Sequence, residues 1–212
     1  MSTPSGPRSI KISNDERGGW SSDRPRREGA PPRPADVSVR SRVLRPSDRL
    51  RYMPGSLVVL VSGTPAERDR FAERVLEDRS ALLSLDRVRA LLSGRVADDQ
   101  IEARAPELLD AAVTKRLTSN QSVVLATEGL DPAERERFVR IAAGAQRPRH
   151  LILLEAGRDQ VAEEDRAVLN ELRRSLDAGE LGAEGFHTAL RLGGVTISEV
   201  KRILFRPPPR DE

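Results

Sequence analysis

The sequence predicts an α/β fold in which helices cover both faces of a parallel sheet of about five strands. The first observation is a set of short, continuous apolar runs, which are typical of strands buried on both sides. The second is that segments with helical spacing separate these runs, so strand and helix alternate along the chain. The runs are SLVVLVS (56–62), ALLSL (81–85), SVVLAT (122–127), HLILLE (150–155) and a weaker fifth, HTALRL (187–192).

The helices are predicted from apolar residues that recur on one face. Asp131 is expected to cap the third helix, with Pro132 in its first position and Glu134 completing a capping box. Gly179 is expected to end the fourth helix, and a last short helix begins at Thr196. The apolar faces comprise Phe71, Val75 and Leu76; Leu108, Leu109, Ala112, Val113 and Leu117; Phe138, Ile141 and Ala142; Val168, Leu169, Leu172 and Leu176; and Val200, Ile203 and Leu204.

Composition divides the chain into three parts. Residues 1–53 are rich in Arg, Pro, Gly and Ser without a periodic apolar pattern, so we expect a disordered, basic tail. Residues 54–206 are expected to form the folded domain, and residues 207–212 a short Pro-rich C-terminal tail. The first part carries twelve basic and six acidic side chains, a net charge of +6 in a chain whose overall charge is only +3.

The basic segment 1–53 is consistent with three roles. Its arginines would contact the phosphates of a nucleic acid with release of counterions. They would equally suit an acidic protein partner. The third role is a solubilising extension without a partner. The sequence does not indicate an oligomeric state.

Several classes of protein are excluded by composition. The chain has no Cys and only two histidines, His150 and His187, so thiolate and His-based metal sites are not expected. No apolar segment approaches the roughly 20 residues that span a bilayer, and the N-terminus lacks the apolar core of a signal peptide. We therefore expect a soluble, cytoplasmic protein that does not bind a membrane.

The first strand and helix flank the segment VLVSGTPAERDRFAERVL (59–76). In an open α/β sheet, ligands bind beyond the carboxyl ends of the strands, so this connection is the first place to seek a site. A phosphate-binding loop there reads Gly-x-x-x-x-Gly-Lys-Ser/Thr. Its glycines let the backbone wrap the phosphates, its lysine pairs with the outer phosphates, and its hydroxyl holds Mg²⁺.

The order of the elements resembles the P-loop kinases, in particular the group that contains polynucleotide 5′-hydroxyl kinases and zeta-toxin-like AAA-type ATP-binding domains. LLSLDRVRALLSG (82–94) is similar to the second-strand motif of that group, and SVVLATEGLDPAERERFVRIA (122–142) to its third-strand segment. LRRSLDAGELGAEGFHTALRL (172–192) resembles its closing helix and last strand. The resemblance covers about residues 56–206 and implies a nucleotide-binding kinase fold.

The resemblance also implies where the donor nucleotide would bind, and there the sequence departs from the family pattern. With Ser62 at the first glycine, Glu67 falls at the second glycine, Arg68 at the lysine and Asp69 at the metal hydroxyl. Starting from Gly63 instead puts Arg68 at the second glycine, Asp69 at the lysine and Arg70 at the hydroxyl. Neither register restores the motif, although Arg68 is a candidate substitute cation.

Two further donor-side features differ from the family. Leu125 stands at the position of the Asp in the family's Asp-Ala-Thr, although Thr127 is retained as a candidate nucleotide-binding residue. The connection after the fourth strand is too short for the family's arginine-bearing lid and offers only Arg158 and Arg166. Together with the loop, these departures remove most of the electrostatic stabilisation that phosphoryl transfer needs.

The acceptor side keeps two candidate catalytic residues. By resemblance, Asp86 matches the general base for the attacking hydroxyl and Arg89 the residue that binds a substrate phosphate. Their spacing puts them on one face of the helix after the second strand. The alternative is a helix cap at Asp86 and a solvated Arg89. His150, His187 and Glu184 are expected to be packing or surface groups.

Three functions are therefore open at this stage. The first is a non-catalytic P-loop kinase-like domain, a pseudoenzyme that binds a partner, a nucleotide or a nucleic-acid end. The second is an ATP-dependent kinase of polynucleotide 5′-hydroxyls or of a small molecule, with ATP and Mg²⁺ as cofactors and Arg68 replacing the lysine. The third is a nucleic-acid-binding accessory that acts through residues 1–53. We favour the first, because three losses on the donor side are hard to repair together.

Overall fold

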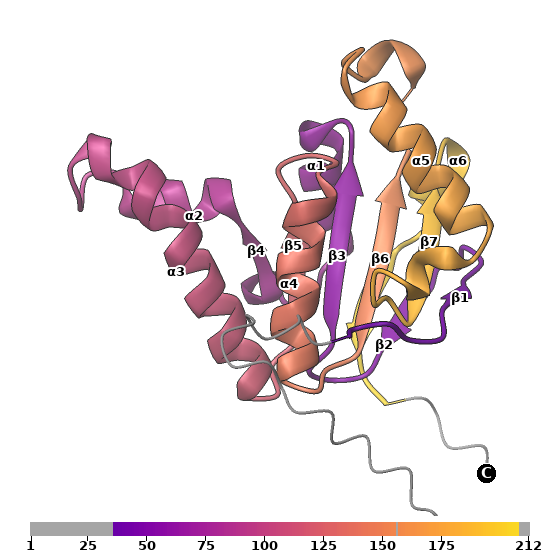
Figure 1. The fold of residues 1–212 in the computed structure, drawn as a ribbon, viewed down its shortest axis with the longest axis horizontal. Coiled ribbons are helices and arrows are strands. Elements are labelled where there is room, and N and C mark those ends of the chain that lie inside the picture. Colours follow the sequence, from indigo (N-terminus) through magenta and orange to yellow (C-terminus); the bar gives the residue numbers. More distant parts are fainter. Residues whose placement is uncertain (1–35, 156, 208–212) are drawn as a thin grey trace, which may run out of the picture. The chain divides into compact units, whose positions relative to one another are not determined.

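The computed structural model describes residues 36–155 and 157–207, which all belong to one compact unit. Within these residues, six parallel strands form the central sheet in the order β1-β7-β6-β3-β5-β4 (Figure 1). The α/β fold with a parallel sheet is therefore confirmed, and the five predicted strands are joined by β1 at one edge. The strands are β1 (Arg42–Val43), β3 (Leu57–Ser62), β4 (Leu82–Ser84), β5 (Val123–Ala126), β6 (Arg149–Leu154) and β7 (Thr188–Leu192).

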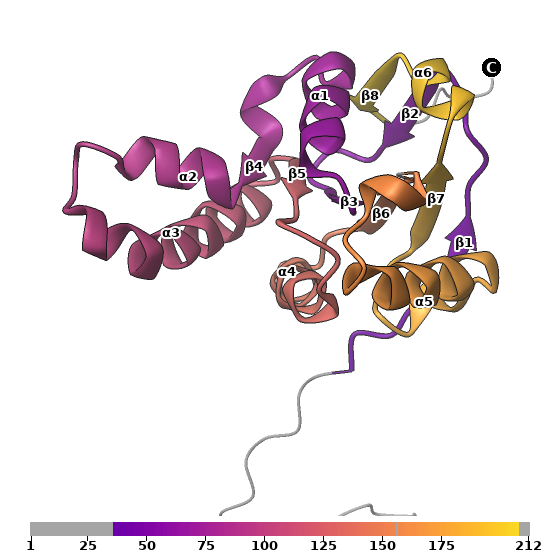
Figure 2. The same cartoon turned by 90° about the horizontal axis from the view of Figure 1, so that it is seen from above.

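Helices lie on both faces of this sheet, as Figure 2 shows. α1 packs on one face together with a small two-stranded sheet, and α3, α4 and α5 pack on the other. β3 serves both cores, because Leu57, Val59 and Val61 contact one layer while Val58 and Leu60 contact the other. The helices are α1 (Pro65–Val75), α2 (Leu85–Leu92), α3 (Asp98–Thr118), α4 (Pro132–Gly144), α5 (Asp165–Asp177) and α6 (Val195–Glu199), with 3₁₀ turns η1 (Arg79–Ala81), η2 (Arg158–Gln160) and η3 (Glu180–Gly182).

The predicted ends of α4 and α5 agree with the structure, apart from the capping box at Glu134. The side chain of Asp131 accepts a hydrogen bond from the N–H of Ala133, as expected of an N-cap, and Gly179 ends α5 in the left-handed conformation with φ 73°. Glu134 does not complete a capping box, because its carboxylate accepts the N–H of Glu128 instead. Leu108 is also not part of the α3 core face, since it is 44% exposed.

The folded unit begins before residue 54, so the predicted disorder of residues 1–53 is wrong for residues 36–53. β1 pairs with β7, and β2 (Arg49–Tyr52) pairs with β8 (Arg202–Phe205) in the two-stranded sheet. Leu50 and Tyr52 are each only 4% exposed, so this segment buries apolar surface that its composition does not predict. Residues 1–35 and 208–212 lie outside the described residues, and the predictions for them stay predictions.

The C-terminal helix was expected to carry Val200, Ile203 and Leu204, and this expectation is wrong. α6 is only five residues long, and β8 follows it as a strand beside β2. The hydroxyl of Thr196 contacts the N–H and the carbonyl of Gly193 rather than capping a longer helix. Pairing with a parallel strand about 150 residues away in sequence thus overrides a local apolar spacing that is typical of a helix.

Candidate functional site

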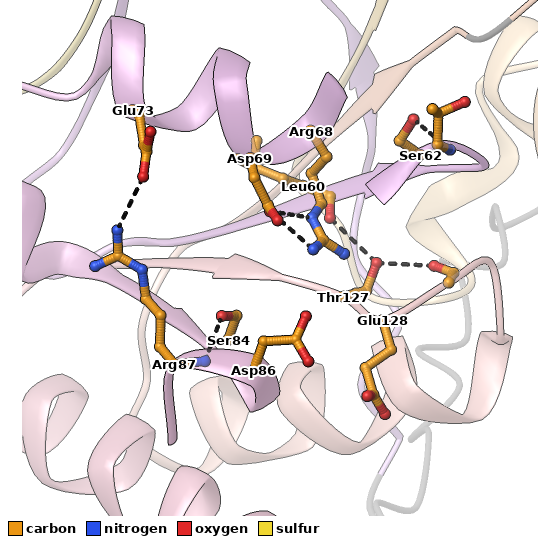
Figure 3. A network of polar contacts seen from close by, with 12 residues as sticks. Leu60, Ser62, Arg68, Asp69, Glu73, Ser84, Asp86, Arg87, Thr127 and Glu128 are labelled. Atoms are coloured by element: carbon orange, nitrogen blue, oxygen red, sulfur yellow. Dashed lines mark hydrogen bonds and ion pairs between the residues drawn. The ribbon is translucent and has the colours of Figure 1, made fainter. Parts of the chain in front are cut away.

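The candidate site lies at the carboxyl edge of the sheet, where β3, β4, β5 and β6 end next to one another. Ser62 is the last residue of β3, Ser84 of β4 and Ala126 of β5. This edge is where open parallel sheets bind their ligands, because β3 lies between neighbours whose connections run in opposite directions. Most of the predicted site residues lie at or near it, and Figure 3 shows Ser62, Arg68, Asp69, Asp86 and Thr127 there.

The connection between β3 and α1 is short. β3 ends at Ser62 and α1 begins at Pro65, so only Gly63 and Thr64 lie between them. The hydroxyl of Ser62 accepts the N–H of Thr64 at 3.1 Å, which closes the turn locally. Val161 covers this turn from the other side, because a Cβ on Gly63 would lie 3.0 Å from its Cγ2 atom.

Arg68 projects from α1 beneath this turn. It is only 1% exposed, and its Nε and Nη2 atoms both lie 2.8 Å from Oδ1 of Asp69, as Figure 3 shows. Its Nη1 atom is buried without a hydrogen-bond partner among the described residues. The carboxylate of Asp69 is about half exposed. Arg68 is therefore an internal cation whose charge is already paired.

Thr127 lies below Arg68 at the end of β5 and is completely buried. Its hydroxyl lies 2.8 Å from the carbonyl oxygen of Gly129 and 3.1 Å from that of Leu60, and its N–H donates to the same Leu60 carbonyl. The retained threonine therefore links β5 to β3 through the backbone. Its polar atoms already have protein partners.

Asp86 and Arg89 lie together on α2, with Nη1 of Arg89 3.1 Å from Oδ1 of Asp86. The proximity predicted from their spacing is thus present, although the N-cap of α2 is Ser84 rather than Asp86. Arg89 also binds Glu102 at 2.8 Å and contacts Glu128, two residues that sequence reasoning missed. Three carboxylates therefore surround one guanidinium.

Electrostatics around Arg89 follow from this crowding. The hydrogen bonds that Arg89 donates to Glu102 and Glu128 raise the pKa of Arg89 above its ordinary value, and the bond to Glu102 lowers the pKa of that carboxyl. Burial is the first cause that raises the pKa of nearby Glu134, and the charge of Glu128 adds to it. The acceptor side is consequently acidic, with more carboxylates than cations.

A cavity of about 890 Å³ opens beside α1 on the other side from Arg68. Phe71, Leu154 and Ile197 give it apolar walls, and Arg70 and Lys201 lie at its lining. Arg74 connects α1 to the segment after β7, because its guanidinium donates to the carbonyls of Ile197 at 2.6 Å and Val200 at 2.7 Å. Arg70 lines this cavity, whereas Arg68 does not.

The sequence did not point to this cavity because its walls come from α1, the end of β6 and the segment around α6. One local signal was present, since the Gly193-Gly194 pair follows β7 at the carboxyl edge. Glu155, which also lines the cavity, accepts hydrogen bonds from Arg173 and Arg191. These two arginines are therefore held by a carboxylate at the end of β6.

The connection that would carry a lid runs from Glu155 to Glu164 and contains η2. Arg158 lies in η2, and Arg166 lies in the first turn of α5 beside Val161 and Leu169. The Nε atom of Arg166 is buried without a partner among the described residues. This short connection packs Val161 over the β3–α1 turn.

The remaining polar candidates have structural environments. Glu184 forms a two-point ion pair with Arg135, which is 2% exposed and also donates to the carbonyl of Leu130. His150 packs against Tyr52 with ring centroids 4.5 Å apart, and its Nδ1 lies 2.8 Å from the hydroxyl of Thr188. Burial lowers the pKa of His150 to about 3. These groups therefore stabilise the fold, and His150 lies near the amino end of β6, away from the carboxyl edge.

In residues 36–155 and 157–207, no three His, Asp or Glu side chains gather closely enough to hold a metal ion. Over the same ranges, no helix has the length and apolar character needed to cross a membrane.

The sheet order, the helices on both faces and the site at the carboxyl edge are those of the P-loop kinase superfamily. Residues 68–173, half of the chain, match the family model described as AAA domain, and the chain belongs to this family. The match begins at Arg68 in α1 and ends at Arg173 in α5. No curated protein matches the chain.

Proposed function

We propose that this chain is a non-catalytic P-loop kinase-like domain that acts through binding. The observation that carries the proposal is the two-residue connection between Ser62 and Pro65. In a phosphate-binding loop, four residues lie between the two glycines, and the lysine follows the second glycine. This length lets successive N–H groups encircle the phosphate. A turn of two residues leaves no backbone for that purpose.

The charges beneath the turn support the same proposal. Only the register that starts at Ser62 puts a cation, Arg68, at the lysine position. Arg68 is buried, and Asp69 already neutralises it. A charge-assisted contact to a phosphate is worth about 1.5–3 kcal/mol, and a phosphate would here have to displace a carboxylate from Arg68. Stabilisation of the transferring phosphoryl group is therefore weak on the donor side.

The acceptor side adds a second argument. Arg89 matches the residue that binds a substrate phosphate in the family resemblance, but Asp86, Glu102 and Glu128 already surround it. A phosphate approaching this guanidinium would meet three negative charges. Repulsion of the phosphate therefore opposes the polynucleotide kinase alternative on that side as well.

The cavity beside α1 supports binding of a nucleoside or nucleotide through its base. An apolar pocket with a few polar groups is the usual form of a small-molecule site, and about 890 Å³ lies within the usual range. Ile197 offers apolar surface to a planar base, while Arg70 and Lys201 offer donors in the cavity lining. We propose that the domain binds such a ligand without transferring a phosphoryl group.

The test is an assay of hydrolysis and transfer with ATP labelled on the γ-phosphate, with Mg²⁺ and 5′-hydroxyl oligonucleotides as acceptors. The proposal predicts no turnover above a protein-free control, and no change on Arg68→Ala substitution. Binding of adenosine is followed in parallel by calorimetry. Ser198→Trp, at the cavity lining, should abolish it, whereas Ser93→Trp on α2 should leave it unchanged. Turnover that disappears in Arg68→Ala would establish the kinase alternative.

A further inference from the structure

Residues 36–53 form an extended segment, which we call the arginine strap, along the edge of the sheet. Figure 2 shows it in indigo, passing from α5 along the outside of β7 to β8. Backbone hydrogen bonds fix it at Val39 to Gly182, at Arg42 to His187 and at Leu44 to Ala189. β2 continues the attachment through four registered pairs with β8, from Arg49 to Tyr52.

Exposure differs along the strap, and its arginines are among the side chains that face solvent. Val37 packs on one hydrophobic core and Leu44 on the other, while Leu50 and Tyr52 are buried beside β8. The outward positions hold every arginine of the strap. These are Arg40, Arg42, Arg45, Arg49 and Arg51, all exposed.

The arginines of the strap differ from most site arginines in having almost no acidic partners. Arg49 lies 3.5 Å from Asp48 in a solvent-exposed pair. Among the described residues, the side chains of Arg40, Arg42, Arg45 and Arg51 make no hydrogen bond or ion pair. Arg89 and Arg135, by contrast, are held by carboxylates. Contacts within the described residues therefore do not explain why these arginines are present.

We propose that the arginine strap binds the phosphate backbone of a nucleic acid. Guanidinium groups bind phosphate oxygens through two parallel hydrogen bonds, and the strap contains arginine without lysine. Arg40 and Arg42, like Arg49 and Arg51, are two positions apart, which is about 6.6 Å in an extended chain. The strap thus presents a row of charges, already ordered, to a linear polyanion.

The neighbouring sequence adds to this charge. Residues 1–35 contain seven basic and four acidic side chains, and they join the strap at Asp36. A lipid surface is less well matched, because an interfacial segment needs a broad apolar face beside its cations. Val43 and Met53 are the exposed large hydrophobic residues of the strap, and they lie ten positions apart. This inference does not depend on nucleotide binding in the cavity beside α1.

The experiment measures binding of the full chain to a fluorescent 20-nucleotide single strand by anisotropy, over a series of salt concentrations. The strap variant carries Arg40→Gln, Arg42→Gln, Arg45→Gln and Arg51→Gln. It should bind at least tenfold more weakly. The slope of log K against log[salt] should fall by about 2 to 3, since each lost contact to a single strand removes about 0.7.

Two matched variants locate the effect. The first carries Gln at four exposed arginines elsewhere in the domain, Arg79, Arg95, Arg104 and Arg174. The second carries Gln at Arg17, Arg24, Arg26 and Arg27, which precede the strap. The proposal expects the first to bind like the unmodified chain and the second to keep more affinity than the strap variant. It is overturned if the strap variant loses no affinity, if the first control loses as much, or if only anionic vesicles bind.

Discussion

Arg68 and Asp69 are adjacent on α1 and form an ion pair of 2.8 Å, in which the guanidinium is buried and the carboxylate is half exposed. In the register that starts at Ser62, Arg68 falls at the lysine position of a phosphate-binding loop. The charge of Arg68 is therefore used within the protein rather than offered to a ligand. The first prediction follows from this internal use.

Replacing Arg68 with Met should leave the free energy of unfolding unchanged or raise it by up to about 2 kcal/mol. Apolar groups of similar volume often replace buried ion pairs without loss, and the exposed side of Asp69 can be solvated. Arg68→Ala should lower the free energy of unfolding by about 2–4 kcal/mol, because it leaves a cavity. Urea denaturation of both variants measures this. A loss above about 3 kcal/mol in Arg68→Met would mean that the fold needs the charge.

The second prediction concerns the packing of Val161 over Gly63. Gly63→Ala should destabilise the chain, because the new Cβ would lie 3.0 Å from one methyl of Val161 and 3.2 Å from the other. Combining it with Val161→Ala should recover part of the loss, giving a coupling energy of about 0.5–3 kcal/mol in a double-mutant cycle. Purely additive effects would show that Val161 does not close the β3–α1 turn.

The third prediction concerns acid stability. Because the pKa of folded His150 is about 3 and that of an unfolded histidine about 6.5, only the unfolded chain gains this proton between those values. The free energy of unfolding should therefore fall below pH 6.5, by about 1.4 kcal/mol per pH unit from this group. The pKa of His187 is also lowered, first by burial, and adds to the slope.

Comparing the chain with His150→Asn between pH 7 and pH 5 isolates the contribution of His150, because most carboxylates stay ionised in that window. The variant should lose stability less steeply as the pH falls. Equal slopes for the two proteins in urea denaturation would contradict the low pKa of His150.

The fourth prediction concerns the attachment of the arginine strap. A Cβ on Gly182 would lie 2.2 Å from the carbonyl oxygen of Val39, so Gly182→Ala should displace the strap. Gly144→Ala is the matched control, since nothing lies within 4 Å of its new Cβ and alanine favours the helix. Limited proteolysis should cleave residues 36–53 faster only in Gly182→Ala. Equal cleavage would mean that the strap tolerates this change.

The central strands were predictable because each is a short apolar run that needs no distant information to recognise. β1 and β2 were missed because they are short, rich in Arg and interrupted by Pro46, and their partners β7 and β8 lie about 150 residues away. β8 was taken for a helix for the same reason. Val200, Ile203 and Leu204 have helical spacing, and only the pairing with β2 makes the last two residues part of a strand.

The site was predictable only where it depends on local spacing. Asp86 and Arg89 are three residues apart on one helix, so their contact follows from helical geometry. Glu102 and Glu128 reach the same guanidinium from α3 and from the segment after β5, which no local pattern reveals. The length of the β3–α1 turn was likewise hidden, because the sequence allowed two registers for the loop. Tertiary packing decided both.

The measurement that tests the central claim most directly compares the melting temperature of the chain with adenosine and with ATP and Mg²⁺, each at the same concentration. The account predicts equal shifts in melting temperature, because the β3–α1 turn offers the phosphates neither a phosphate-binding loop nor an unpaired cation beneath it. At a fixed ligand concentration the stabilisation increases with affinity and reaches about 2.7 kcal/mol at 100 times the dissociation constant, so tighter binding of ATP would give a larger shift. A larger shift with ATP and Mg²⁺ that is lost in Arg68→Ala would contradict the account.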